Sequence, residues 1–286
     1  MDIKTAKLKI LAKILIMLSA IVVGASFSGC VNDSKSEANE LIKMLPYNYN
    51  GFIYVNFETL KGEESSQYRS KILNMLKIRN TNEDETGIYI NKTKRMIFGG
   101  SSYDNFVMII EGDYDFDKFK NHLKKVGINP TEEYEGFKIY TKPDEEFALT
   151  IYKDMIIAGT KQGVRECIDV IKGKEESLLK NEGVMDIYDK LPSDACVYEV
   201  RNAYDPWDNT IADGSSISFE DNNMVKIVRV EKYKDEETAK EKYEELLKKK
   251  ERDKEDIEKK GIKVDIKLDG QYVIVEVEGP ENEANF

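Results

Sequence analysis

Apolar residues recur along the chain with two periods, which separate predicted helices from predicted strands. At two places they stand at i, i+3, i+4 and i+7 directly before a proline, the pattern of one face of a short helix that the proline ends. Each helix precedes an apolar run typical of a strand, over Phe52–Phe57 and Ala195–Arg201. The two helices match residue by residue at a constant spacing: Ala38, Leu41, Ile42, Leu45 and Pro46 in the first, and Val184, Ile187, Tyr188, Leu191 and Pro192 in the second.

The correspondence continues beyond these first strands. In the first half, a predicted strand over Phe106–Glu111 leads to a helix that Asp115 caps and Gly127 ends. In the second half, a predicted strand over Val225–Glu231 leads to a helix capped by Asp235. We therefore expect helix, strand, strand, helix and hairpin in this order in both halves, as two copies of one module.

The hairpin of the second half shows a clear alternation of apolar and polar residues. Every second residue from Ile262 to Leu268 is apolar, and Asp269–Gly270 supplies a two-residue turn. In the first half a third strand, Met155–Ala158, extends the hairpin, and Thr160 caps a helix running to about Ile171. Alternation indicates a sheet with one buried face. The predicted fold class is α+β, with two related modules, each an antiparallel sheet with helices packed on one face, over residues 37–181 and 182–286.

The two halves differ most after their first strand. The first half inserts a predicted helix over Ser66–Leu76 and a polar loop over Asn80–Thr86. The second half has a predicted loop over Asn202–Glu220, which holds the single tryptophan, Trp207.

The first thirty residues have the pattern of an export signal. Four lysines precede an apolar run over Ile14–Phe27, which is short for a membrane-spanning helix. Phe27-Ser28-Gly29-Cys30 resembles the lipobox of prokaryotic lipoproteins, although Phe27 replaces the usual Leu, Val or Ile. We predict a signal peptide over residues 1–29, and a lipidated Cys30 with a tether over residues 30–36. The alternative is an uncleaved anchor helix, and both place the folded part on the extracytoplasmic side of the cell membrane.

The charge of the chain restricts its partners. The formal net charge is −11, and cleavage before Cys30 would remove more lysines than acids. Such a surface repels nucleic acid and anionic lipid, so we expect no nucleic-acid partner. Membrane attachment would then depend on the lipid at Cys30.

Several motifs together resemble a group of uncharacterised exported prokaryotic proteins, including archaeal lipoproteins, known as domains of unknown function. The motifs are Leu-Pro followed by a strand, Glu111-Gly112-Asp113-Tyr114-Asp115-Phe116, Tyr134-Glu135-Gly136-Phe137-Lys138-Ile139-Tyr140, Met155-Ile156-Ile157-Ala158-Gly159-Thr160 and Ser177-Leu178-Leu179. The resemblance covers most of residues 40–200. It implies a fold and an exported location, and it supplies no catalytic residues.

Residues for catalysis or metal binding are sparse. The single histidine, His122, lies off the apolar face of its predicted helix and is interpreted as a surface residue. Cys167 and Cys196 form no zinc pattern, and whether they form a disulfide stays open. The acids from Asp113 to Asp117 begin like a calcium loop, but Lys118 and Lys124 stand where glycine and glutamate are needed. We expect no metal, no cofactor and no catalytic residues.

Trp207 is the candidate for recognition in the second half. Its neighbours Tyr204, Asp205 and Asp208 give an aromatic plane beside acids, which suits a sugar or a cation, while the alternative is a loop plug on the sheet. Asn32 and Asn91 fit the N-glycan acceptor pattern.

The sequence thus predicts a lipid-anchored envelope protein without enzymatic activity. It would bind a small ligand or an envelope protein. The alternatives are a hydrolase of envelope polymers that uses paired carboxylates, and a structural or assembly factor.

Overall fold

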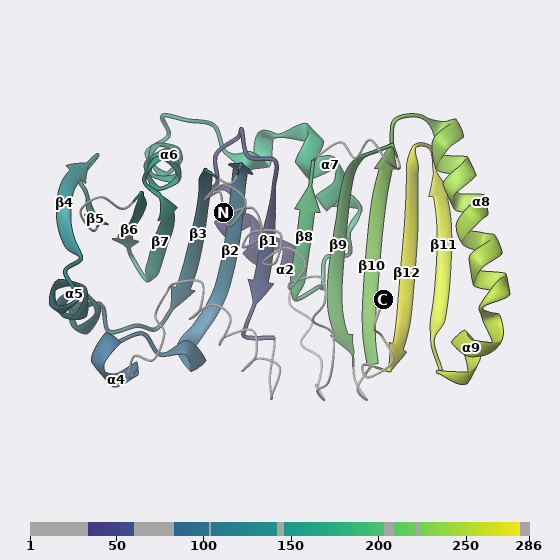
Figure 1. The fold of residues 1–286 in the computed structure, drawn as a ribbon, viewed down its shortest axis with the longest axis horizontal. Helices are drawn as coiled ribbons and strands as arrows, with labels where there is room; N and C mark the ends of the chain where they lie inside the picture. Colours follow the sequence, from purple (N-terminus) through teal and green to yellow (C-terminus); the bar gives the residue numbers. More distant parts are fainter. Residues whose placement is uncertain are drawn as a thin grey trace, which may run out of the picture. The chain divides into compact units, whose positions relative to one another are not determined.

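A computed structural model describes residues 34–59, 83–102, 104–141, 146–202, 209–220 and 224–280 (Figure 1). These residues form two compact units, which we name the N-terminal unit, residues 34–182, and the C-terminal unit, residues 183–280.

The N-terminal unit combines helices with seven of the strands. Its elements are α2 (Ser34–Ile42), β1 (Gly51–Asn56), α4 (Glu83–Thr86), the 3₁₀ helix η1 (Ile90–Lys92), β2 (Thr93–Ser102), β3 (Asn105–Gly112), α5 (Phe116–Lys125), β4 (Asn129–Tyr134), β5 (Phe137–Thr141), β6 (Phe147–Tyr152), β7 (Met155–Thr160), α6 (Lys161–Ile171) and the 3₁₀ helix η2 (Leu178–Lys180).

The C-terminal unit is built from fewer elements. They are α7 (Glu182–Lys190), β8 (Val197–Arg201), β9 (Thr210–Glu220), β10 (Met224–Tyr233), α8 (Glu236–Arg252), α9 (Lys254–Lys259), β11 (Lys263–Asp269) and β12 (Tyr272–Pro280).

The strands of the described residues belong to a single antiparallel sheet. Its twelve strands are ordered β11-β12-β10-β9-β8-β1-β2-β3-β7-β6-β5-β4. The prediction of a separate sheet for each of two modules is therefore wrong. Hydrophobic periodicity shows which side of a strand is buried, but it contains no information on where a sheet ends.

Helices cover both faces of the sheet in the N-terminal unit, so the prediction of helices on one face is also wrong. On one face, α5 packs Phe119 and Leu123 against Ile156 and Ala158 of β7. Met155 points to the opposite face, because side chains alternate along a strand, and it lines a cavity together with α6. β7 is a continuous apolar run, and it is therefore buried on both faces. The hairpin β11–β12 differs, because its apolar and polar residues alternate.

The C-terminal unit likewise has helices on both faces. Ala239 of α8 packs against Tyr233 and Val273. Lys232 and Tyr272 precede Tyr233 and Val273 in their strands, so their side chains point to the opposite face. There they donate hydrogen bonds to Asp186 of α7.

Several predicted elements are confirmed and others are corrected. The strands β1, β3, β8 and β10 and the helix caps of α5, α6 and α8 are present. The two-residue turn predicted at Asp269–Gly270 lies one residue further on, because Asp269 pairs with Tyr272; it consists of Gly270, with a positive φ of 58°, and Gln271. The predicted loop Asn202–Glu220 is wrong from Thr210 onward, because β9 begins there. Glu83–Thr86, predicted as part of a loop, is helical, and Ser66–Leu76 lies outside the described residues.

Two strands with polar or glycine-containing ends escaped prediction in the N-terminal unit. They are β2 and β4. The third strand β7 extends the β5–β6 hairpin as predicted, because it pairs with β6, and on its other side it pairs with β3. The helix α2 begins at Ser34, within the predicted tether.

The start of α6 is fixed by a side-chain cap and by close backbone packing. Thr160 Oγ1 accepts a hydrogen bond from Gly163 N at 3.0 Å. A Cβ atom on Gly163 would lie 2.3 Å from the carbonyl oxygen of Phe106, so only glycine allows this approach. Behind it, Cys167 is fully buried as a free thiol, and Cys196 is a second buried free cysteine.

Replacement of Thr160 tests the cap. We expect Thr160→Ala to lower the free energy of unfolding by about 1–2 kcal/mol, because it leaves Gly163 N without its acceptor. Chemical denaturation followed by circular dichroism measures the change. Thr160→Ser retains the hydroxyl and is the matched control; equal losses for both variants would contradict a role for the hydrogen bond.

Candidate functional site

Two pockets of the N-terminal unit lie on either side of the tight turn between β6 and β7. We name the first the inner cavity, of about 390 Å³, which α2, β2, β3 and the end of α6 enclose together with the turn. We name the second the surface groove, of about 580 Å³, which follows the start of α5. Lys153 and Asp154, the two residues of the turn, line both.

Three residues of a row in register, Arg95, Glu111 and Met155, form the floor of the inner cavity. Asn56 of β1 pairs with Arg95 of β2, Arg95 with Glu111 of β3, and Glu111 with Met155 of β7. Directly opposed residues of neighbouring strands point to the same face. The sheet therefore presents an amide, a guanidinium, a carboxylate and a thioether side by side.

Arg95 and Glu111 form an ion pair that is mostly shielded from water. Nε of Arg95 donates to Oε2 of Glu111 at 2.7 Å, and the two side chains are 18% and 10% exposed. Burial opposes the charge on Arg95, but the hydrogen bond and attraction of Glu111 outweigh it, so the pKa of the guanidinium is raised. The guanidinium of Arg95 therefore stays charged at the bottom of the cavity.

The helix α2 is tied to this row by its first turns. Arg95 Nη1 donates to the carbonyl oxygen of Glu37 at 3.2 Å, and Asn56 Nδ2 donates to the Glu37 carboxylate at 2.7 Å. These bonds position the next turn of α2 over the row. Leu41 from that turn and Met44, which follows the helix, form one apolar wall, and Met155 and Val170 form the other.

Lys153 occupies the mouth of the inner cavity in an unfavourable backbone conformation. Its φ of 54° lies in the left-handed region, which costs a side-chain-bearing residue about 1 kcal/mol. The comparable turn between β11 and β12 uses Gly270. Among the described residues Lys153 has no carboxylate partner, and its ammonium lies 5.1 Å from the ring centre of Tyr152.

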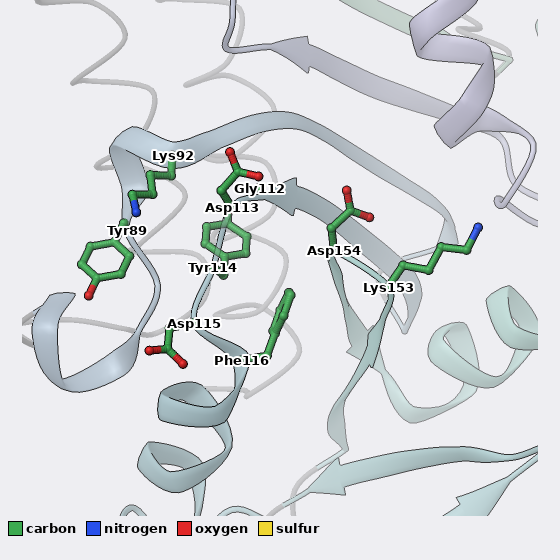
Figure 2. A pocket seen from close by; sticks show the side chains of 9 residues that line it. All are labelled: Tyr89, Lys92, Gly112, Asp113, Tyr114, Asp115, Phe116, Lys153 and Asp154. Atoms are coloured by element: carbon green, nitrogen blue, oxygen red, sulfur yellow. The ribbon is translucent and has the colours of Figure 1, made fainter.

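The surface groove is lined by aromatic rings and carboxylates. Figure 2 shows Tyr89 and Lys92 on one side, Phe116 and Asp154 on the other, and Tyr114 between them. Lys153 points away from Tyr89 and Lys92 in this view, toward the other side of the turn.

The recognition site predicted from the sequence cannot be compared with these pockets. Trp207, Tyr204, Asp205 and Asp208 lie outside the described residues, as do Cys30 and Asn32. Asn91 is exposed in η1.

The acids considered for calcium have other partners. The carboxylate of Asp115 accepts from Lys118 N at 3.0 Å as the cap of α5, which confirms the capping prediction. Asp113 pairs with Lys94 at 2.8 Å. In the described ranges no group of three or more His, Cys, Asp or Glu residues is placed to hold a metal ion. His122 is half-buried on α5.

Sequence reasoning missed the residues that form the inner cavity. A weak signal existed, since Arg95 directly precedes one apolar run and Glu111 directly follows another, and charges are rarely buried unless paired. The pairing itself depends on the register of β2 against β3, which the sequence does not display.

In the part of the chain that the structure covers, no helix combines the length and the apolar character needed to cross a bilayer.

The fold is similar to that of a solved protein. TP0453 superposes in its crystal form IV with a TM-score of 0.52 over 84% of this chain and 93% of that chain, and in form I with a TM-score of 0.50 over 90% and 96%. Sequence identity is 11% in both cases, so the likeness concerns the fold alone.

Sequence relatives come from an archaeon. No protein-family model matches the chain. The uncharacterized protein MJ1281 of Methanocaldococcus jannaschii is 30% identical over 115 residues, which are 38% of this chain and 10% of that protein.

A second relative matches almost from end to end. The uncharacterized protein MJ0635 of Methanocaldococcus jannaschii is 71% identical over 275 residues, which are 96% of this chain and 97% of that protein. The resemblance to an uncharacterised archaeal family is thereby confirmed, and the chain belongs to the family of MJ0635.

Proposed function

We propose that the chain is a lipid-anchored protein on the extracytoplasmic side of the cell membrane, and that it binds a small ligand in the inner cavity without transforming it. The observation that carries the proposal is Lys153, a strained lysine without a carboxylate partner among the described residues, at the mouth of a cavity. Unfavourable backbone conformations persist where the surrounding structure or a function maintains them.

The inner cavity has the size and the lining of a small-molecule site. Its volume of about 390 Å³ falls within the usual range, and its walls are apolar with a few charged groups. Arg95 and Glu111 neutralise each other's charge. The floor can therefore orient a ligand through polar groups without adding a net charge. Lys153 adds a positive charge at the mouth beside the carboxylate of Asp154, while Glu40 and Lys43, the other charged residues of the lining, pair with each other. We infer a ligand with an apolar body and an anionic group.

The proposed location is supported by the sequence of the first thirty residues. Basic residues, a short apolar run and Phe27-Ser28-Gly29-Cys30 follow each other in the order of a lipoprotein signal. Attachment to the membrane through Cys30 would display the cavity outside the cytoplasm.

Replacement of Lys153 by glycine tests the cavity. Lys153→Gly relieves the backbone strain, so we expect the free energy of unfolding to rise by about 1 kcal/mol. The same change removes the ammonium, so we expect the affinity for anilinonaphthalene sulfonate, a fluorescent amphiphilic anion, to fall by about tenfold. Fluorescence titration and denaturation measure the two effects.

A matched control is available in the turn between β4 and β5. Glu135 also has a positive φ, 51°, and lies outside the lining of the cavity. Glu135→Gly should leave dye binding unchanged. Unaltered dye binding in Lys153→Gly, or an equal loss in both variants, would refute the proposed site.

Replacement of Cys30 tests the lipid anchor. In an archaeal host, we expect the full chain to partition into the detergent phase and to carry a lipid label, and Cys30→Ala to lose both because it lacks the acceptor thiol. Cys167→Ala, which removes a buried thiol, is the control and should partition like the wild type. Retention of the label by Cys30→Ala would contradict the anchor.

A further inference from the structure

We propose that the surface groove is a second binding site, independent of the inner cavity, and that it takes a neutral carbohydrate chain. The groove lies beyond the Lys153–Asp154 turn and is open to solvent along the start of α5. A volume of about 580 Å³ accommodates more than one sugar ring, and the open side allows a chain to continue past it.

The aromatic rings of the groove are held in fixed positions. Tyr114 OH and Thr93 Oγ1 share a hydrogen bond of 2.7 Å, and Phe116 meets the Tyr114 ring edge to face at 5.9 Å. Gly112 is needed beneath this ring, because a Cβ atom there would lie 2.5 Å from Cζ of Tyr114. Rigid aromatic faces bind the C–H faces of sugar rings with little loss of conformational entropy.

Hydrogen-bond acceptors and donors both surround these rings. Asp154 has no ion-pair partner among the described residues, so its carboxylate is available to accept from two neighbouring hydroxyls. Lys92, whose ammonium lies 4.7 Å from the ring centre of Tyr89, is available to donate. The hydroxyl groups of a polyol both donate and accept hydrogen bonds. They could therefore donate to Asp154 and accept from Lys92.

The charges disfavour two other ligand classes. Asp113 pairs with Lys94, but Asp115 and Asp154 balance the charges of Lys92 and Lys153, so the lining has no excess positive charge to attract an anion such as a phosphate. Aromatic rings beside carboxylates also suit a quaternary ammonium ion, but Lys92 already places a cation on the Tyr89 ring and repels a second one. A neutral sugar avoids both penalties.

Calorimetric titration of the full chain tests the proposal, with maltohexaose, cellohexaose, chitohexaose and mannohexaose as probes. We expect at least one of them to bind with a dissociation constant of about 1 mM or below. Tyr89→Ala should weaken that binding by about tenfold, and Lys92→Gln, an exposed change that leaves the rings in place, by about threefold. Tyr47→Ala removes an exposed tyrosine elsewhere in the N-terminal unit and should leave the affinity unchanged.

The outcomes separate this proposal from the one for the inner cavity. Binding of anilinonaphthalene sulfonate should be unaffected by Tyr89→Ala and Lys92→Gln, because neither residue lines the inner cavity. Failure of all four hexasaccharides to bind, or equal effects of Tyr89→Ala and Tyr47→Ala, would overturn the carbohydrate site. Displacement of the sugar by tetramethylammonium would overturn it in favour of a cation site.

Discussion

The ion pair between Arg95 and Glu111 is the constraint on which the arrangement of the N-terminal unit depends. Two charges that are 18% and 10% exposed lose most of their hydration and have to satisfy each other. Loss of one partner from such a pair typically costs about 3–5 kcal/mol. Because Arg95 also binds the backbone of Glu37, the same pair fixes α2 against the sheet. The inner cavity exists where that helix stops and the apolar walls of Met155 and Val170 begin.

The turn between β6 and β7 connects this interior with the surface. Its two residues line both pockets, and Lys153 adopts a conformation for which another hairpin of the chain uses glycine. Glycine would relieve the strain at this position, although Glu135 in the turn between β4 and β5 has a positive φ as well. In our proposals the charge of Lys153 serves the inner cavity, and the carboxylate of Asp154 serves the surface groove.

Patterns that depend on neighbouring residues could be read from the sequence, and patterns that depend on register could not. The caps Asp115 and Thr160 are local and stand where the sequence indicates, and the turn at Gly270 lies within one residue of its predicted place. The extent of the sheet, the helices on both faces and the strand β9 depend on pairing between distant segments. The meeting of Arg95 with Glu111 depends on pairing as well, so the candidate site was not predictable although both of its charges were visible.

The burial of the two described cysteines has a practical consequence. Cys167 and Cys196 are shielded free thiols in the cores of the two units, and burial raises the pKa of Cys167, which suppresses its reactive thiolate. Among the described residues, a single cysteine introduced on the exposed surface would then be the one reactive thiol. Once Cys30 is replaced, spectroscopic labels could be attached beside either pocket with Cys167 and Cys196 left in place, and α2 and the β6–β7 turn could be labelled separately.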